Sequence, residues 1–95
     1  MPTLSDFATP VVKETLAQRA KKAAETNAMF DAEKSVGRYR DAAIVTPAYT
    51  RSALLQMGWQ LSRGESKSYR AAFMTAFADA WTERYTELTG KAVQP

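Results

Sequence analysis

The chain has 95 residues, a formal net charge of +3, no cysteine and no histidine. This length corresponds to one domain, and the lack of cysteine excludes a disulfide-stapled secreted scaffold and thiolate chemistry. The N-terminal residues resemble no signal peptide and no apolar run approaches the ~20 residues that span a bilayer, so we expect a single soluble, cytoplasmic domain over residues 1–95.

The first helix is predicted from a cap signal and from composition. Residues 1–8 should form a loose arm, and Thr9 and Pro10 then offer an N-cap followed by proline at the first helical position. From residue 10 to about 36 the chain is rich in good helix formers. Its apolar stripe is thin and consists of Val12, Leu16, Ala20, Ala23, Asn27 and Phe30. So thin a stripe packs along one line only, against a neighbouring helix or, as a homodimer, against a second copy.

The middle of the chain predicts a short helical piece at 38–43 and a longer helix at 47–63. Thr46 and Pro47 repeat the cap signal before the longer helix. Gly64 stands where a helix C-cap glycine is common. Because Ser66 can cap the next helix, the connection is short and the two helices must be neighbours.

The last helix, predicted over 66–89, has the clearest pattern. At 100° per residue its large side chains fall within roughly half of the circumference, which is typical of a core-facing helix. These residues are Tyr69, Phe73, Phe77, Ala80, Trp81, Tyr85 and Leu88. Arg70 and Arg84 fall inside the stripe, so either they reach its rim or one edge of the stripe meets another molecule. The predicted fold class is all-α, a bundle of three to four helices with a flexible tail at 91–95.

Catalysis has few candidate residues. Without histidine the commonest general base and metal ligand is missing, and without cysteine zinc sites are nearly excluded. Asp79, Glu83 and Glu87 stand four residues apart on the polar side of the last helix, where a solvated face is expected rather than a metal site. No nucleophile motif or phosphate-binding loop occurs. We therefore predict a protein that is not an enzyme and has no cofactor or metal.

Positive charge is concentrated in the middle of the chain. Residues 34–70 hold seven basic and two acidic side chains, and every tyrosine lies within two residues of an arginine. Arginine beside tyrosine is typical of nucleic-acid grooves, where guanidinium groups pair with phosphates and rings stack on bases. It is also typical of protein hot spots. A solvated basic face with half-buried tyrosines is the third interpretation.

These patterns favour a small non-enzymatic regulatory or accessory protein that binds DNA, RNA or a nucleoprotein complex. The alternative is an adaptor or inhibitor that binds an acidic protein surface, and a structural assembly subunit is a third hypothesis. Candidate residues for either partner are Lys34, Arg38, Tyr39, Arg40, Tyr49, Arg51, Arg63, Ser66, Lys67, Arg70 and Arg84. The turn at 61–70 resembles a DNA-reading helix-turn-helix. The alanine-rich, single-domain character resembles that of accessory proteins encoded by phages and plasmids.

Overall fold

The computed structural model describes residues 14–38 and 49–94, and this part of the chain forms three helices and no strand. The helices are α2 (Leu16–Arg38), α3 (Arg51–Leu61) and α4 (Lys67–Thr89). The predicted all-α fold class is thereby confirmed. The predicted arm at 1–8 and all but the first residue of the predicted helical piece at 38–43 lie outside the described residues.

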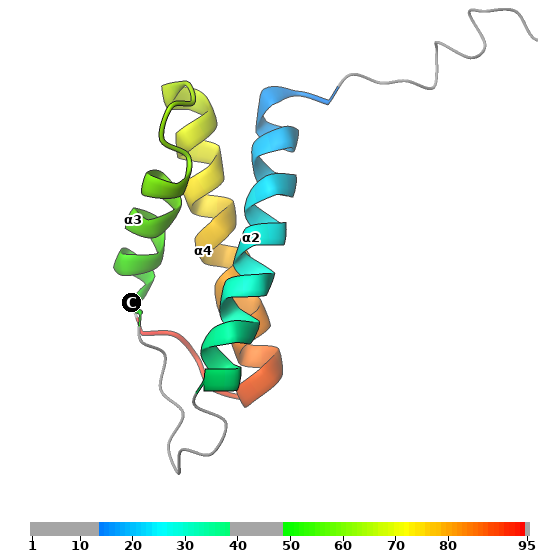
Figure 1. The fold of residues 1–95 in the computed structure, drawn as a ribbon, viewed down its shortest axis with the longest axis vertical. Helices are drawn as coiled ribbons and strands as arrows, with labels where there is room; N and C mark the ends of the chain where they lie inside the picture. The colour runs from blue at the N-terminus through cyan, green and yellow to red at the C-terminus, as the bar shows by residue number, and fades with distance from the viewer. Residues whose placement is uncertain (1–13, 39–48, 95) are drawn as a thin grey trace, which may run out of the picture.

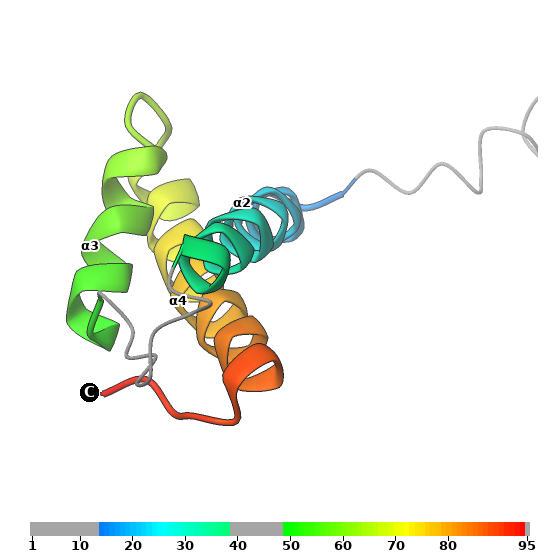
Figure 2. The same ribbon diagram turned by 60° about the horizontal axis from the view of Figure 1, so that its bottom comes forward.

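The long helix α4 lies between the other two helices and packs against both (Figure 1). It runs in the same direction as α2 and antiparallel to α3. After α4 the chain returns towards α3 (Figure 2), where the carbonyl of Gln94 accepts a 2.8 Å hydrogen bond from the backbone N–H of Arg51. Gln94, within the segment predicted to be a flexible tail at 91–95, thus contacts the first turn of α3.

The predicted continuous helices 10–36 and 47–63 are too long, because residues 14, 15, 49 and 50 are not helical and α3 ends at Leu61, whereas Pro10 and Pro47 themselves lie outside the described residues. A reciprocal capping box begins α2 instead: the N–H of Gln18 donates to Oγ1 of Thr15 at 3.1 Å, and the N–H of Thr15 donates to Oε1 of Gln18 at 2.8 Å. Such a box satisfies two backbone donors, whereas a capping threonine alone satisfies one.

The second helix begins after another threonine. Oγ1 of Thr50 accepts a 3.2 Å hydrogen bond from the N–H of Ala53, which makes Thr50 the N-cap of α3. Both ends of α4 are as predicted. Ser66 is its N-cap, with a side chain that accepts from the N–H of Tyr69, and Gly90 ends it with a left-handed φ of 72°.

The aromatic stripe of α4 forms the core, as predicted. Four of its five rings are buried: Phe73, Phe77, Trp81 and Tyr85. Tyr69 is half-buried, and Leu88 at the end of the predicted stripe is 40% exposed. Successive rings stack, with centroids 6.2 Å apart for Phe73 and Phe77 and 5.3 Å apart for Trp81 and Tyr85. From the α3 side, Leu54 is fully buried against this row.

The face of α2 that packs on this core differs from the predicted one. Its fully buried residues are four alanines spaced four apart: Ala20, Ala24, Ala28 and Ala32. Of the predicted stripe, Phe30 is 65% exposed and Leu16 is 36% exposed. The large rings of α4 already fill the interior, so only methyl groups fit between the two helices. None of the described helices combines the length and hydropathy of a membrane span.

Candidate partner-binding site

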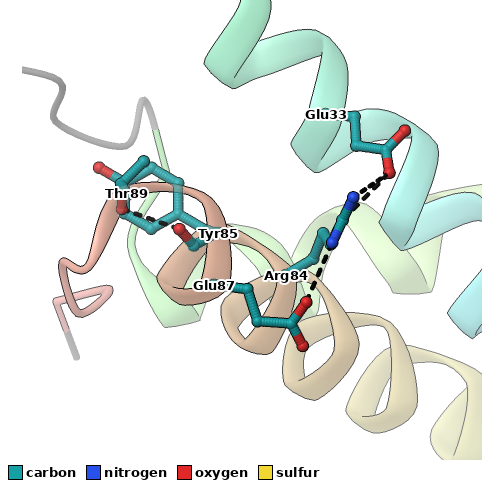
Figure 3. A network of polar contacts seen from close by, with 5 residues as sticks. All are labelled: Glu33, Arg84, Tyr85, Glu87 and Thr89. Carbon is teal, nitrogen blue, oxygen red and sulfur yellow. Dashed lines mark hydrogen bonds and ion pairs between the residues drawn. The ribbon is translucent and has the colours of Figure 1, made fainter.

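Arg84 holds α2 against α4. Its Nε and Nη2 atoms donate to one oxygen of Glu33 at 3.0 and 2.8 Å, and its Nη1 donates to Glu87 at 3.0 Å (Figure 3). The hydrogen bond to Glu33, followed by that to Glu87, raises the pKa of Arg84 above its ordinary value. Since Glu33 and Arg84 lie on different helices, the ion pair of Arg84 stabilises the packing of α2 on α4.

Arg51 and Tyr49 also contact other parts of the fold. The guanidinium of Arg51 pairs with Asp79 of α4 at 2.8 Å. The ring of Tyr49 meets Trp81 edge-on, with centroids 5.8 Å apart. Two more of the predicted partner-binding residues therefore pack α3, and the residues just before it, against α4.

Arg70 lies on the side chain and the carbonyl of Trp59. Its Nε and Nη2 atoms donate to the Trp59 carbonyl oxygen at 3.2 and 2.7 Å, and its Cζ atom stands 3.8 Å from the centroid of the indole ring. Both side chains are half-buried. Arg70 and Arg84, the two arginines inside the aromatic stripe, thus extend to its rim. This was one of the two arrangements predicted from the sequence. Sequence reasoning missed Trp59 because the contact crosses the turn between two helices.

The remaining candidates behave differently. Lys34, Arg63 and Lys67 are exposed and form no ion pair within the described part of the chain. Ser66 is engaged as the N-cap of α4. The side chain of Arg38 and the whole of Tyr39 and Arg40 lie outside what the structure describes.

The three exposed cations do not form one face. Lys34 follows Glu33, which contacts Arg84 near the end of α4. Lys67 begins α4, seventeen residues before Arg84, so the two lysines stand at levels about 25 Å apart at a rise of 1.5 Å per residue. Arg63 and Lys67 flank the turn between α3 and α4. We call the set Trp59, Arg63, Lys67 and Arg70 the corner surface.

The corner surface is positively charged. Arg63, Lys67 and Arg70 contribute three positive charges, and Glu65 in the same turn contributes one negative charge, which leaves +2. A preformed stack of arginine on tryptophan beside two exposed cations suits an acidic protein surface or a phosphate.

The described tyrosines pack within the fold rather than standing out from it. Tyr69 stacks on Phe73 with centroids 6.1 Å apart, and Tyr85 is 1% exposed. Adjacent residues on a helix point about 100° apart, so a tyrosine directed at the core places its neighbouring arginine at the rim. Core packing thus accounts for the sequence pairs at 69–70 and 84–85 without any base stacking.

Comparison with known proteins gives no relative: no protein family, no curated protein and no solved structure matches the chain. Within the described residues, no three side chains from histidine, cysteine, aspartate and glutamate gather in a way that could hold a metal ion. Function is therefore inferred from the arrangement of this chain's own side chains.

Proposed function

We propose that the protein is a non-enzymatic protein-binding module, an adaptor or inhibitor, that recognises an acidic surface of its partner through the corner surface. The observation that carries this proposal is the stack of Arg70 on Trp59, fixed by two hydrogen bonds to the Trp59 carbonyl. Tryptophan and arginine dominate binding hot spots, and a side chain that is already ordered loses less entropy when a partner docks. The cations of Arg63 and Lys67 would steer an acidic partner towards the stack.

Binding of DNA or RNA is the second candidate, and the same three cations favour it. If each of Arg63, Lys67 and Arg70 neutralised one phosphate, log affinity for duplex would fall with log salt at a slope of about −2.7. The support is weaker than for a protein partner, because Arg51 and Arg84 are engaged in ion pairs and Tyr49 is packed on Trp81. Few charges and no free tyrosine ring among the described residues then remain for a nucleic-acid strand.

The experiment is an affinity capture from a lysate of the native host, with and without nuclease. The bait proteins are the unaltered chain, Arg63→Glu and the matched control Lys91→Glu, which makes the same charge change beyond the far end of α4. We expect a nuclease-resistant partner that Arg63→Glu captures about tenfold less well and Lys91→Glu captures normally. Loss of capture on nuclease treatment favours nucleic acid, and equal capture by all three baits contradicts a role for the corner surface.

The stack itself gives a sharper test once a partner is in hand. Truncation of a hot-spot tryptophan removes about 2 kcal/mol or more of binding energy, so Trp59→Ala should weaken binding by about thirtyfold. Leu61→Ala is the control, because Leu61 is 54% exposed on the same helix and lies outside the corner surface. If Leu61→Ala weakens binding as much as Trp59→Ala, the stack has no special role.

A further inference from the structure

A groove of about 790 Å³ lies between α2 and α4. Alanines from both helices line it: Ala17 of α2 and Ala72, Ala76 and Ala80 of α4. Met29 also lines the groove and is 46% exposed. Because alanine projects only a methyl group, another helix could approach both backbones closely, in the manner of the α2–α4 contact itself. The groove could not be predicted from the sequence, because its lining comes from segments about fifty residues apart.

The charge of the groove is opposite to that of the whole chain. Four carboxylates and two cations line it, which gives −2, whereas the chain carries +3. They are Lys21, Glu25, Asp79, Glu83, Arg84 and Glu87. Counting the ion-pair partners just outside the lining, Arg51 and Glu33, adds one charge of each sign and leaves −2. Glu83 is exposed and forms no ion pair in the described ranges.

We infer that this groove binds an amphipathic helix of a partner protein, with small or aliphatic side chains on its apolar face and Lys or Arg along both edges. The alanine-lined groove and exposed Met29 suit a helix laid lengthwise between α2 and α4, and methionine adapts to varied apolar surfaces. The carboxylates, Glu83 foremost, would meet the basic edges. This site goes beyond the corner surface and differs from it in lining and in sign of charge, so either can fail without the other.

The probe is a dye-labelled model peptide of ~20 residues, long enough to be partly helical alone. One version carries leucine and alanine on one face and lysine on the edges, and the matched version replaces every lysine by glutamate. Fluorescence anisotropy with the intact protein should show the basic peptide binding at least about tenfold more tightly than the acidic one, with a difference that shrinks as salt is raised.

Two substitutions locate the site. Glu83→Lys changes the charge of the lining from −2 to 0 without breaking any ion pair that the structure shows, and should weaken the basic peptide by about tenfold. Its matched control is Glu65→Lys, the same change in the turn before α4, which should leave affinity within about twofold. Ala76→Arg fills the groove and should also abolish binding, with circular dichroism to verify folding. If Ala76→Arg does not fold, the pair Glu83→Lys and Glu65→Lys still decides.

Three results would overturn the inference. The first is equal binding, or no binding, of the basic and acidic peptides. The second is equal weakening by Glu83→Lys and Glu65→Lys, which would indicate a general charge effect. The third is self-association of the protein that Ala76→Arg abolishes, since the groove would then hold a second copy. If any of these results is found but capture from the host lysate still depends on Arg63, the groove inference fails and the proposed function is unaffected. If only the dependence on Arg63 is lost, the proposed function fails and the groove inference is unaffected.

Discussion

The indole Nε1–H of Trp81 donates a 2.9 Å hydrogen bond to Oδ2 of Asp31, across fifty residues of sequence. It joins the buried centre of α4 to a half-buried position on α2. A buried tryptophan needs a partner for its single polar atom, and here the partner comes from the helix that otherwise contributes alanine methyl groups. Together with the pair between Glu33 and Arg84, it fixes how far α2 is shifted along α4.

Removal of this acceptor should destabilise the fold. Asp31→Ala leaves the indole N–H of the fully buried Trp81 without a partner, which should lower the free energy of unfolding by about 1–3 kcal/mol. Asp31→Asn retains a side-chain oxygen acceptor and should lower it by less than about 1 kcal/mol. Urea denaturation followed by tryptophan fluorescence measures both. Equal losses for the two variants would mean that the charge of Asp31, rather than its hydrogen bond, matters.

Gly58 allows α3 to approach α4, and adding a methyl group there should be destabilising. A Cβ atom at Gly58 would lie 2.7 Å from the Cα atom of Met74. In an exposed helix Gly→Ala normally stabilises, but here overpacking should lower the free energy of unfolding by about 1–3 kcal/mol. Because the nearest atom belongs to the backbone, adding Met74→Ala should not restore stability in the double variant. Recovery on truncating Met74 would place the conflict in its side chain instead.

The alanine seam of α2 should reject larger side chains. Ala28 is fully buried between α2 and α4, so Ala28→Leu should lower the free energy of unfolding by about 1–3 kcal/mol. Ala71→Leu makes the same change at an exposed position of α4 and should alter stability by no more than about 0.5 kcal/mol. Thermal unfolding of both proteins tests this. Equal behaviour of the two would imply that α2 packs more loosely than its buried alanines indicate.

Self-association through α2 remains a prediction, and Phe30 is the residue to test. Leu16, Ala23 and Phe30 stand seven residues apart, and Phe30 is 65% exposed. If two copies bury this line, Phe30→Glu should weaken the dimer by at least about tenfold in analytical ultracentrifugation, because it places a charge at the interface. Ala71→Glu, which adds the same negative charge at an exposed position of α4, is the control. A compact monomer at all micromolar concentrations rules out the dimer.

The ammonium of Lys22 should titrate above the ordinary lysine value. Its hydrogen bond to Glu14 at 2.7 Å, reinforced by the charge of that carboxylate, raises the pKa of Lys22 above 10.5. A raised folded-state pKa means that the pair stabilises the fold fully below 10.5, and that this contribution disappears as pH rises through the raised value. Side-chain NMR titration should show the shift, and Glu14→Gln should reduce it. An unchanged titration in Glu14→Gln would exclude the pair in solution.

Local signals in the sequence were sufficient for α4. Ser66 and Gly90 act on the backbone within a few residues of themselves, so both ends of the helix could be predicted. The aromatic periodicity also identified the buried face, because burial of large apolar rings against a neighbouring helix is strongly favourable. Thr15 and Gln18 are an equally local signal for the start of α2, as Thr50 is for the start of α3, whereas the two Thr–Pro pairs lie outside the described residues.

Only the tertiary structure decided which face of α2 is buried and which arginines stay free. Hydrophobicity alone favours burying Phe30 over Ala28, yet the rings of α4 leave room between the helices for methyl groups only. The engagement of Arg84 by Glu33 depends on how two helices are aligned across about fifty residues. Composition determined that this would be a helical protein with excess positive charge. Packing of α2 and α3 on α4 determined which positive charges are neutralised by ion pairs and which remain unpaired at the corner surface. It also determined where the negatively charged groove lies.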